Sequence, residues 1–265
     1  MQTALTIAGF DPSSGAGVTA DLMVFAAHGL VGTSCITALT VQSAVGVRST
    51  HPTSPDIVTA TLECLSKDLP PCGIKIGMLA TAVITIRICE YLEKHRPTDW
   101  DSGAVVLDPV IRSSSGRELL EAEGVAILRD RLIPLVDWIT PNLEELAMLS
   151  GIPVLRRDDL PLATRALQDR IGERPHGGRL GILATGGHLD PPDDFLLMPN
   201  GEEIWLPGEQ VAAPSTHGTG CALSSAFLSR IVLGDTPPEA ALSAKLYVTR
   251  VLRTATRHGL GHAYK

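Results

Sequence analysis

The sequence predicts an α/β fold in which parallel strands are joined by crossover helices. Short apolar runs alternate with longer amphipathic stretches along the chain, which is typical of repeated strand–helix units. Several of the short runs are apolar throughout, as expected for strands that helices cover on both faces. The chain has 265 residues, 44% of them hydrophobic, which is enough to bury one large core. We therefore expect a single domain over residues 1–265.

Six short apolar runs are predicted to be strands, at residues 4–8, 33–41, 73–76, 104–107, 138–139 and 180–184. Eight longer stretches are predicted to be helices, at residues 18–28, 56–68, 81–94, 118–132, 143–149, 160–171, 218–233 and 238–258. The second helix has a recognisable start, because Ser54 is a favourable cap and Pro55 suits the first helical position. Asn200-Gly201 favours a hairpin between residues 195–198 and 203–206, and we place this hairpin at an edge of the sheet.

Charge and cysteine content argue against several classes of protein. The net charge is −7 and the Lys and Arg residues are scattered, so we expect no surface for nucleic acid. The five cysteines form no CxxC pair and lie mostly in apolar segments, which is typical of reduced, buried thiols. The first residues do not have the pattern of a signal peptide, and no stretch reaches the roughly 18 apolar residues of a membrane span. These observations favour a cytoplasmic protein that binds neither nucleic acid nor membrane.

The most informative motif is THGTGC at residues 216–221, a turn that runs directly into an apolar helix. Gly218 and Gly220 remove side-chain bulk and allow unusual backbone angles. Successive N–H groups, including that of Thr219, can then face an anion at the positive end of the helix. We expect this turn to stabilise a transferring phosphoryl group.

Cys221 carries the sharpest catalytic hypothesis. A thiol in the first turn of a helix has its pKa lowered by the helix dipole and by nearby N–H groups, so we expect Cys221 to be partly ionised near neutral pH. It could then accept a hydroxyl proton. The alternative is a small, inert cysteine that packs at the start of the helix.

Other candidate residues follow predicted strands, where open parallel sheets bind their ligands. Asp108 comes directly after a strand, while Asn142 and Glu145 are three positions apart at a helix start and share a face. Together they could hold Mg²⁺, which prefers oxygen ligands and keeps several waters. The alternative is that Asn142 caps the helix and Glu145 completes a capping box, and both roles can coexist.

The sequence indicates the residues that would contact a substrate less strongly. Gln42 ends an apolar strand, and its amide can hydrogen-bond to a ring nitrogen and an adjacent exocyclic amine. The alternative interpretation is that Gln42 is only a solvated residue at the end of the strand. Met78 can pack on a ligand ring or simply fill the core. The glycine-rich loop at residues 9–17 matches neither a dinucleotide fingerprint nor a P-loop, so a plain strand-to-helix turn remains open. Asp21 is most simply a favourable charge near a helix start.

Taken together, the motifs resemble those of the ribokinase-like superfamily, and within it the hydroxymethylpyrimidine and phosphomethylpyrimidine kinases of thiamin biosynthesis. Any one motif is ordinary, but their order and spacing are specific and cover nearly the whole chain. They are residues 4–17 (ALTIAGFDPSSGAG), 20–22 (ADL), 36–42 (ITALTVQ), 75–79 (KIGML), 106–110 (VLDPV), 140–145 (TPNLEE), 186–188 (GGH) and 216–221 (THGTGC). The resemblance implies a three-layer sandwich with a central, mostly parallel sheet flanked by helices.

The resemblance also implies roles for particular residues. ATP and Mg²⁺ would serve phosphoryl transfer to 4-amino-5-hydroxymethyl-2-methylpyrimidine and then to its monophosphate. A homodimer is also implied. The pyrimidine would lie against Gly9, Gln42, Met78 and Val110 with Asp21 nearby; the phosphate would meet Gly218, Thr219, Gly220 and Cys221; ATP would meet Asn142, Thr185, Gly187 and Thr216; the metal would meet Asp108 and Glu145.

The chain departs from the family pattern at two positions. Ser114 and Thr185 stand where the family commonly has lysines near phosphate. Arg112, His188 or Lys245 could supply compensating charge.

Two other functions remain open. Pyridoxal kinases of vitamin B6 salvage share the fold, although Gln42 favours a ring that carries an exocyclic amine. The two missing lysines also allow a catalytically impaired pyrimidine-binding protein.

Overall fold

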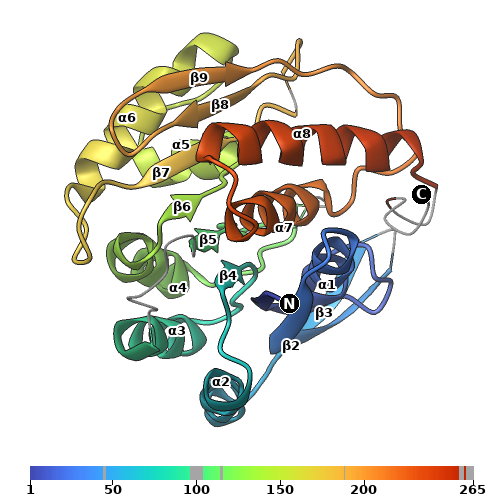
Figure 1. The fold of residues 1–265 in the computed structure, drawn as a ribbon, viewed down its shortest axis with the longest axis vertical. Coiled ribbons are helices and arrows are strands. Elements are labelled where there is room, and N and C mark those ends of the chain that lie inside the picture. Colours follow the sequence, from blue (N-terminus) through green and yellow to red (C-terminus); the bar gives the residue numbers. More distant parts are fainter. Residues whose placement is uncertain (44–45, 96–103, 114–115, 188, 257–259, 261–265) are drawn as a thin grey trace.

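The computed structural model describes residues 1–43, 46–95, 104–113, 116–187, 189–256 and 260. Among these residues, nine strands form one sheet in the order β3-β2-β1-β4-β5-β6-β7-β8-β9. The strands from β2 to β7 pair in parallel, whereas β3 at one end and β8 and β9 at the other pair antiparallel. Helices cover both faces of the sheet, so the predicted three-layer α/β sandwich is confirmed (Figure 1).

The parallel strands match the six apolar runs of the sequence. They are β1 (Thr3–Phe10), β2 (Val31–Ser43), β4 (Gly73–Ile76), β5 (Val105–Leu107), β6 (Trp138–Ile139) and β7 (Gly181–Ala184). Successive side chains point to opposite faces of a strand, so Leu5 and Ile7 join the apolar core on one side while Ala4 joins the core on the other. The sheet is therefore buried on both faces, as its continuous apolar runs require.

The helices divide between the two faces of the sheet. One face is covered by α1 (Gly17–Ala27), α7 (Thr219–Val232) and α8 (Pro237–Arg253), which pack around Phe25, Phe227 and Tyr247. The opposite face is covered by α2 (Pro55–Asp68), α3 (Ala82–His95), α4 (Ala122–Ile127), α5 (Leu143–Ser150) and α6 (Leu160–Ile171). Short helical turns lie at Leu128–Leu132, Ile133–Leu135 and Arg157–Asp159. Because the helices cover the two faces, the loops that follow the strands lie along the edge of the sheet.

The prediction of a helix over residues 118–132 is wrong at its start. Leu119 and Leu120 donate their N–H groups to the carbonyl oxygen of Ile111, which keeps this segment extended, and α4 begins only at Ala122. The segment Leu128–Leu132 is a wider π-helical turn. The carboxylate of Glu121 accepts the Ala82 N–H at 2.6 Å, so it serves the start of α3.

The sequence prediction also missed one strand. β3 (Gly46–Pro52) pairs antiparallel with β2, which runs on to Ser43 and so past the predicted end. β3 is a polar edge strand that buries little surface, so it lacks the apolar run that marks the other strands. Ser54 precedes α2 as predicted but its side chain makes no capping hydrogen bond. α8 ends at Arg253, and residues 257–258 of the predicted last helix lie outside the described residues.

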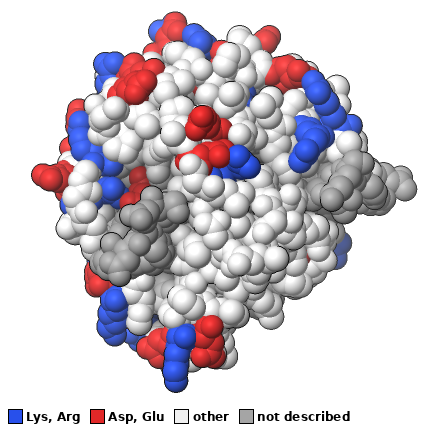
Figure 2. Space-filling view, in the orientation of Figure 1, with Lys and Arg blue, Asp and Glu red and all other residues white. Residues whose placement is uncertain are grey.

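The predicted hairpin is confirmed. β8 (Asp194–Leu197) and β9 (Glu203–Leu206) pair antiparallel, and β9 is the last strand of the sheet. Figure 2 shows basic and acidic side chains interspersed around the rim of one face of the molecule. In the described part of the chain, none of the helices has the length and apolar character that crossing a membrane requires.

Candidate active site

The predicted site residues gather at one edge of the sheet. Parallel strands end on the same side, so the loops that follow them are neighbours. Gln42 lies near the end of β2, Met78 follows β4, Asp108 and Val110 follow β5, Asn142 and Glu145 follow β6, and Thr185 and Gly187 follow β7. The THGTGC turn leads into α7, which packs beneath this edge against β4 and β5.

The THGTGC turn is docked on the glycine-rich loop at residues 9–17. Gly218 has a left-handed backbone with φ of +84°, and a Cβ there would lie 1.8 Å from the carbonyl oxygen of Gly15. No other residue fits this close approach, which confirms that Gly218 provides both space and an unusual angle. Gly220 has a different role, since a Cβ there would lie 3.7 Å from an oxygen of Asp108. The THGTGC turn, which we predict to bind an anion, is thus next to a carboxylate.

The expectation that Cys221 has a lowered pKa is wrong. Burial disfavours the charged thiolate and raises the pKa of Cys221 to about 12, although the positive charge of Lys75 opposes that shift. Asp21 and Asp108 raise it further, while the backbone N–H of Gly17 donates to the sulfur and lowers it. Dehydration therefore outweighs the helix dipole, and the thiol is protonated near neutral pH.

A buried ion pair lies beneath the site. Lys75 on β4 and Asp21 on α1 are both fully buried, and the lysine nitrogen lies 2.9 Å from one carboxylate oxygen. Thr6 and Ser225 donate their hydroxyls to the same carboxylate at 2.5 and 2.8 Å. Burial alone would lower the pKa of Lys75, but attraction to Asp21, Cys221 and Asp108 holds that pKa above its usual value.

This network was missed by the sequence interpretation, which treated Asp21 as a helix-start charge or a neighbour of substrate. The available signal was a lysine inside the otherwise apolar strand GIKI, since a buried lysine requires an acidic partner. The Asp21 carboxylate is bound by Lys75, Thr6 and Ser225 inside the protein, so we assign it a structural role beneath the site.

Asp108 and Glu145 form a second buried acidic pair. Burial raises the pKa of Asp108 to about 6, although Lys75 opposes the shift. Burial and the negative charge of Asp108 raise the pKa of Glu145 to about 8. A bound divalent cation would offset both the burial of the two carboxylates and the repulsion between them. Two carboxylates suit Mg²⁺, which takes few protein ligands together with water and phosphate oxygens. The residues present therefore fit the predicted metal.

The capping interpretation of Asn142 is confirmed. The Asn142 side chain accepts the backbone N–H of Glu145 at 2.9 Å, and one Glu145 oxygen accepts the backbone N–H of Asn142 at 2.9 Å. This reciprocal capping box fixes the start of α5 and holds the Glu145 carboxylate in place. The lone pairs of the Glu145 carboxylate that the capping box does not use are the ones that would bind Mg²⁺.

An apolar wall lies beside the first glycine loop. Met78 packs with Ala38 and Val110, and a Cβ on Gly9 would lie 2.9 Å from the Met78 sulfur. The hydroxyl of Thr37 donates to the Met78 carbonyl oxygen at 2.5 Å, which fixes this residue. The structure thus brings together three of the predicted substrate contacts, Gly9, Met78 and Val110.

Gln42 belongs to a polar cluster that joins the two loops. The His217 ring nitrogen Nε2 lies 3.0 Å from Oδ2 of Asp11 and 3.5 Å from the amide nitrogen of Gln42. The other Asp11 oxygen accepts from the backbone and hydroxyl of Ser13 at 2.8 and 2.7 Å. Asp11 and His217 were not assigned roles from the sequence, because neither residue type is unusual in a loop.

Three of the predicted nucleotide residues, Asn142, Thr185 and Gly187, follow β6 and β7, whereas Thr216 belongs to the turn before α7. Thr185 donates its N–H to the Pro141 carbonyl at 2.9 Å, which joins the loops after β6 and β7. Gly187 is open: apart from its chain neighbours, no atom of the described residues lies within 4 Å of the position a Cβ would take. Thr216 is exposed, and its carbonyl oxygen accepts from the Thr219 hydroxyl at 3.1 Å.

The cations proposed to replace the missing family lysines are engaged elsewhere. Lys245 lies 2.7 Å from Asp194 and donates to the Pro192 carbonyl, while Arg112 lies 3.9 Å from Glu118 on the surface. His188 and Ser114 lie outside the described residues. The other Asp194 oxygen accepts the Gly186 N–H at 2.9 Å, so Lys245 pairs with a carboxylate that also holds the segment after Thr185, whereas Arg112 is engaged at the surface.

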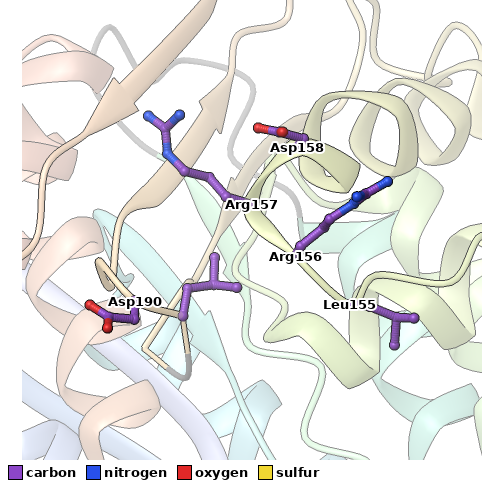
Figure 3. Close-up of a pocket in the computed structure, with 6 residues that line it drawn as sticks. Leu155, Arg156, Arg157, Asp158 and Asp190 are labelled. Carbon is purple, nitrogen blue, oxygen red and sulfur yellow. The ribbon is translucent and has the colours of Figure 1, made fainter.

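A shallow depression of about 320 Å³ lies beyond the nucleotide side, lined by Leu155, Arg156, Arg157, Asp158, Leu189 and Asp190 (Figure 3). Arg157 stacks on the Trp205 ring at 3.7 Å and lies 3.0 Å from Asp193. Its guanidinium is therefore held by the scaffold and does not replace a phosphate-binding lysine.

The sheet order, the two helical layers and the loop positions are those of the ribokinase-like kinases. Solved structures agree with this fold. The chain is 35% identical to a phosphomethylpyrimidine kinase from Clostridium difficile, with a TM-score of 0.78 over 94% of this chain and 99% of that one. It is 29% identical to an ADP complex of Bacillus subtilis pyridoxal kinase, with a TM-score of 0.81 over 96% of this chain and 92% of that one.

Sequence comparisons narrow the class further. The family described as phosphomethylpyrimidine kinase matches residues 11–264. The Escherichia coli hydroxymethylpyrimidine/phosphomethylpyrimidine kinase is 38% identical over 262 residues, which cover 98% of this chain and 94% of that protein. The chain belongs to the phosphomethylpyrimidine kinase family.

Proposed function

We propose that the protein, acting as one domain over residues 1–265, transfers a phosphoryl group from ATP to 4-amino-5-hydroxymethyl-2-methylpyrimidine and then to the monophosphate formed. The product is the diphosphate used in thiamin biosynthesis. Membership of the family supports this proposal. The structural observation that carries it is that Gln42, which suits an aminopyrimidine, and the anion-binding turn at residues 218–221 lie at the same edge of one sheet.

The substrate ring would lie against the apolar wall of Gly9, Met78 and Val110, with its amine toward Gln42. Ring contact provides most of the binding surface, and the amide provides orientation. The hydroxymethyl group would then face the turn from Gly218 to Cys221. Asp21 supports this arrangement from beneath through Lys75.

ATP would bind beside Asn142, Thr185, Gly187 and Thr216. Asp108 and Glu145 would hold Mg²⁺, which supplies positive charge to the phosphate oxygens when it is bound. This assignment accounts for a carboxylate next to an anion-binding turn, because Asp108 and a phosphate would otherwise repel each other.

The transfer would depend mainly on positioning and charge stabilisation, as is general for phosphoryl transfer. The N–H groups of Gly218, Thr219 and Gly220 would stabilise the transferring phosphate. Cys221 is a protonated thiol, so we assign it to contact with the substrate hydroxyl and not to proton removal by a resident thiolate. The fully buried positive charge of Lys75 adds a favourable field beneath the turn.

The test is release of ADP with Mg·ATP in separate reactions with hydroxymethylpyrimidine, its monophosphate, pyridoxal and pyridoxine. We expect turnover of both pyrimidines. Gly218→Ala is the matched inactive variant, because its Cβ has no room against Gly15. Absence of transfer to either pyrimidine would overturn the proposal.

A second candidate is a pyridoxal kinase, which the similarity to the Bacillus subtilis enzyme favours. Turnover of pyridoxal without turnover of the pyrimidines would establish that function. Binding of the pyrimidine in calorimetry without any ADP release would instead indicate a binding protein. We also propose a homodimer and a cytoplasmic location, which sedimentation and cell fractionation would test.

A further inference from the structure

The cluster of Asp11, His217 and Gln42 has a chemistry that the proposed catalytic roles do not use. Asp11 is almost completely buried, with 3% of its side chain exposed, while His217 has 22% exposed. His217 comes from the turn before α7, Asp11 from the loop after β1, and Gln42 from β2. Three separate segments therefore converge on one carboxylate.

The charge state of Asp11 is fixed by its neighbours. Burial raises the pKa of Asp11, but hydrogen bonds from His217, Ser13 and Gln42 outweigh it and lower the pKa to about 2. Asp11 is therefore an ionised carboxylate, which only accepts hydrogen bonds. Its Oδ2 accepts the Ala16 N–H at 2.9 Å and faces His217 Nε2 at 3.0 Å, so that ring nitrogen carries the proton.

This proton sets the orientation of the Gln42 amide. The amide nitrogen lies 3.5 Å from His217 Nε2, and two nitrogens that both carry hydrogen do not bond to each other. The amide nitrogen instead donates to Asp11. One amide N–H is then directed at the carboxylate, which leaves Oε1 and the second N–H to meet a ligand.

We propose that Asp11 and His217 are specificity-determining positioning residues, which hold the Gln42 amide so that Oε1 and the second N–H are presented in a fixed order. This inference rests on the proposed function. The fixed order matches an exocyclic amine, which donates, beside a ring nitrogen, which accepts. The reversed amide would place N–H against the amine and oxygen against the ring nitrogen, and both contacts would be lost.

The same cluster links ring recognition to the phosphate turn. A Cβ on Gly15 would lie 2.5 Å from the His217 ring, and the next residue, Gly218, lies against the Gly15 carbonyl. A shift of His217 would therefore change both the Gln42 amide and the turn. For this reason the test uses a ratio of two substrates measured in one variant, which cancels any general loss of activity.

The two substrates are hydroxymethylpyrimidine and its analogue without the 4-amino group, and the readout is the ratio of their kcat/KM values. The wild-type protein should prefer the amine. His217→Phe keeps a ring but removes the donor to Asp11, and we expect the preference to fall by about tenfold, the scale of one buried hydrogen bond. Asp11→Asn removes the negative charge and replaces one of the two acceptor oxygens by a donor, and it should lower the same ratio. His217→Gln retains a donor and should restore part of it.

Ser13→Ala is the matched control. It removes a 2.7 Å hydrogen bond to the same Asp11 carboxylate, but at Oδ1, which does not face His217. The ratio should stay at the wild-type value in Ser13→Ala. An unchanged ratio in folded His217→Phe and Asp11→Asn, or an equal fall in Ser13→Ala, would overturn the inference while wild-type turnover keeps the proposed function. Absence of wild-type turnover of the pyrimidine would overturn both.

Discussion

Two groups of buried acidic residues lie close together beneath the sheet edge, and only one of them is paired with a cation of the protein. Asp21 is paired with Lys75 at 2.9 Å and accepts hydroxyls from Thr6 and Ser225. Asp108 and Glu145 have no such partner: within the described residues no cation lies within ion-pair distance of either, and their pKa values are raised to about 6 and about 8. The first group has its charge balanced by the protein, and the second has not.

This difference separates scaffold from site. A buried carboxylate with an internal lysine and satisfied hydrogen bonds belongs to the structure whether or not substrates are present. A pair of buried carboxylates without a cation is unfavourable until a cation or protons arrive, and such pairs are typical of functional sites. The comparison predicts that changes at Lys75 act on folding and changes at Glu145 act on pH and metal dependence.

The largest expected effect is that of Lys75→Met. It leaves the Asp21 charge fully buried without its partner, which should lower the free energy of unfolding by about 3–5 kcal/mol. Urea unfolding followed by circular dichroism measures this change. The double variant Lys75→Met with Asp21→Asn should recover much of the loss, because it removes the uncompensated charge.

Arg253→Met is the matched control for that prediction. Arg253 pairs with Glu209 at 2.6 Å, but their side chains are 59% and 56% exposed. Water screens this pair, so its removal should have little effect on stability. Equal losses in Lys75→Met and Arg253→Met would contradict the view that Lys75 supports a buried charge.

The next effect concerns pH in the protein without metal. The pKa values of Asp108 and Glu145 are raised to about 6 and about 8, so folding takes up protons. A carboxyl with a raised pKa stabilises the folded state at low pH, and that stability is lost as pH rises toward the folded pKa. In EDTA, we expect the free energy of unfolding to fall by about 2 kcal/mol between about pH 5 and 8.

Glu145→Gln should flatten this pH dependence, because it removes the charge that Asp108 opposes. The exposed neighbour Glu144 provides the control, and Glu144→Gln should retain the wild-type slope. Added Mg²⁺ should stabilise the wild-type protein at pH 8 and have a weaker effect on Glu145→Gln. Urea unfolding at the two pH values measures all three changes, and parallel slopes in the two variants would contradict the assignment.

The parts of the site that the sequence predicted are those whose chemistry is local. The position of the THGTGC turn, the ends of the apolar strands and the Asn142–Glu145 capping box follow from residues near one another in the chain. Gly218 is a particular case, because a glycine before an apolar helix already indicates a positive φ or a close approach.

The parts that the sequence did not predict depend on distant partners. The pairs Asp21–Lys75 and Asp11–His217 join residues 54 and 206 positions apart, and although Lys75 in an apolar strand indicates an acidic partner, no local pattern shows which residue that partner is. β3 was missed because an edge strand buries little apolar surface. The pKa of Cys221 was expected to be lowered, because a helix start is visible in the sequence whereas the depth of burial is not.

The smallest expected effect is that of Cys221→Ala, and it also extends the comparison, because the thiol lies near both acidic groups. A thiolate serving as general base would contribute a factor of roughly 10²–10⁴ to kcat. The half-buried thiol has a pKa of about 12, so it does not provide that base near neutral pH. We expect kcat of Cys221→Ala to fall by no more than about tenfold, with the same pH profile as the wild type between pH 6 and 9. A loss of a thousandfold, or the disappearance of an ionisation from the profile, would show that substrate binding ionises the thiol. Bound ligands would then determine the charge of the groups beneath the sheet edge.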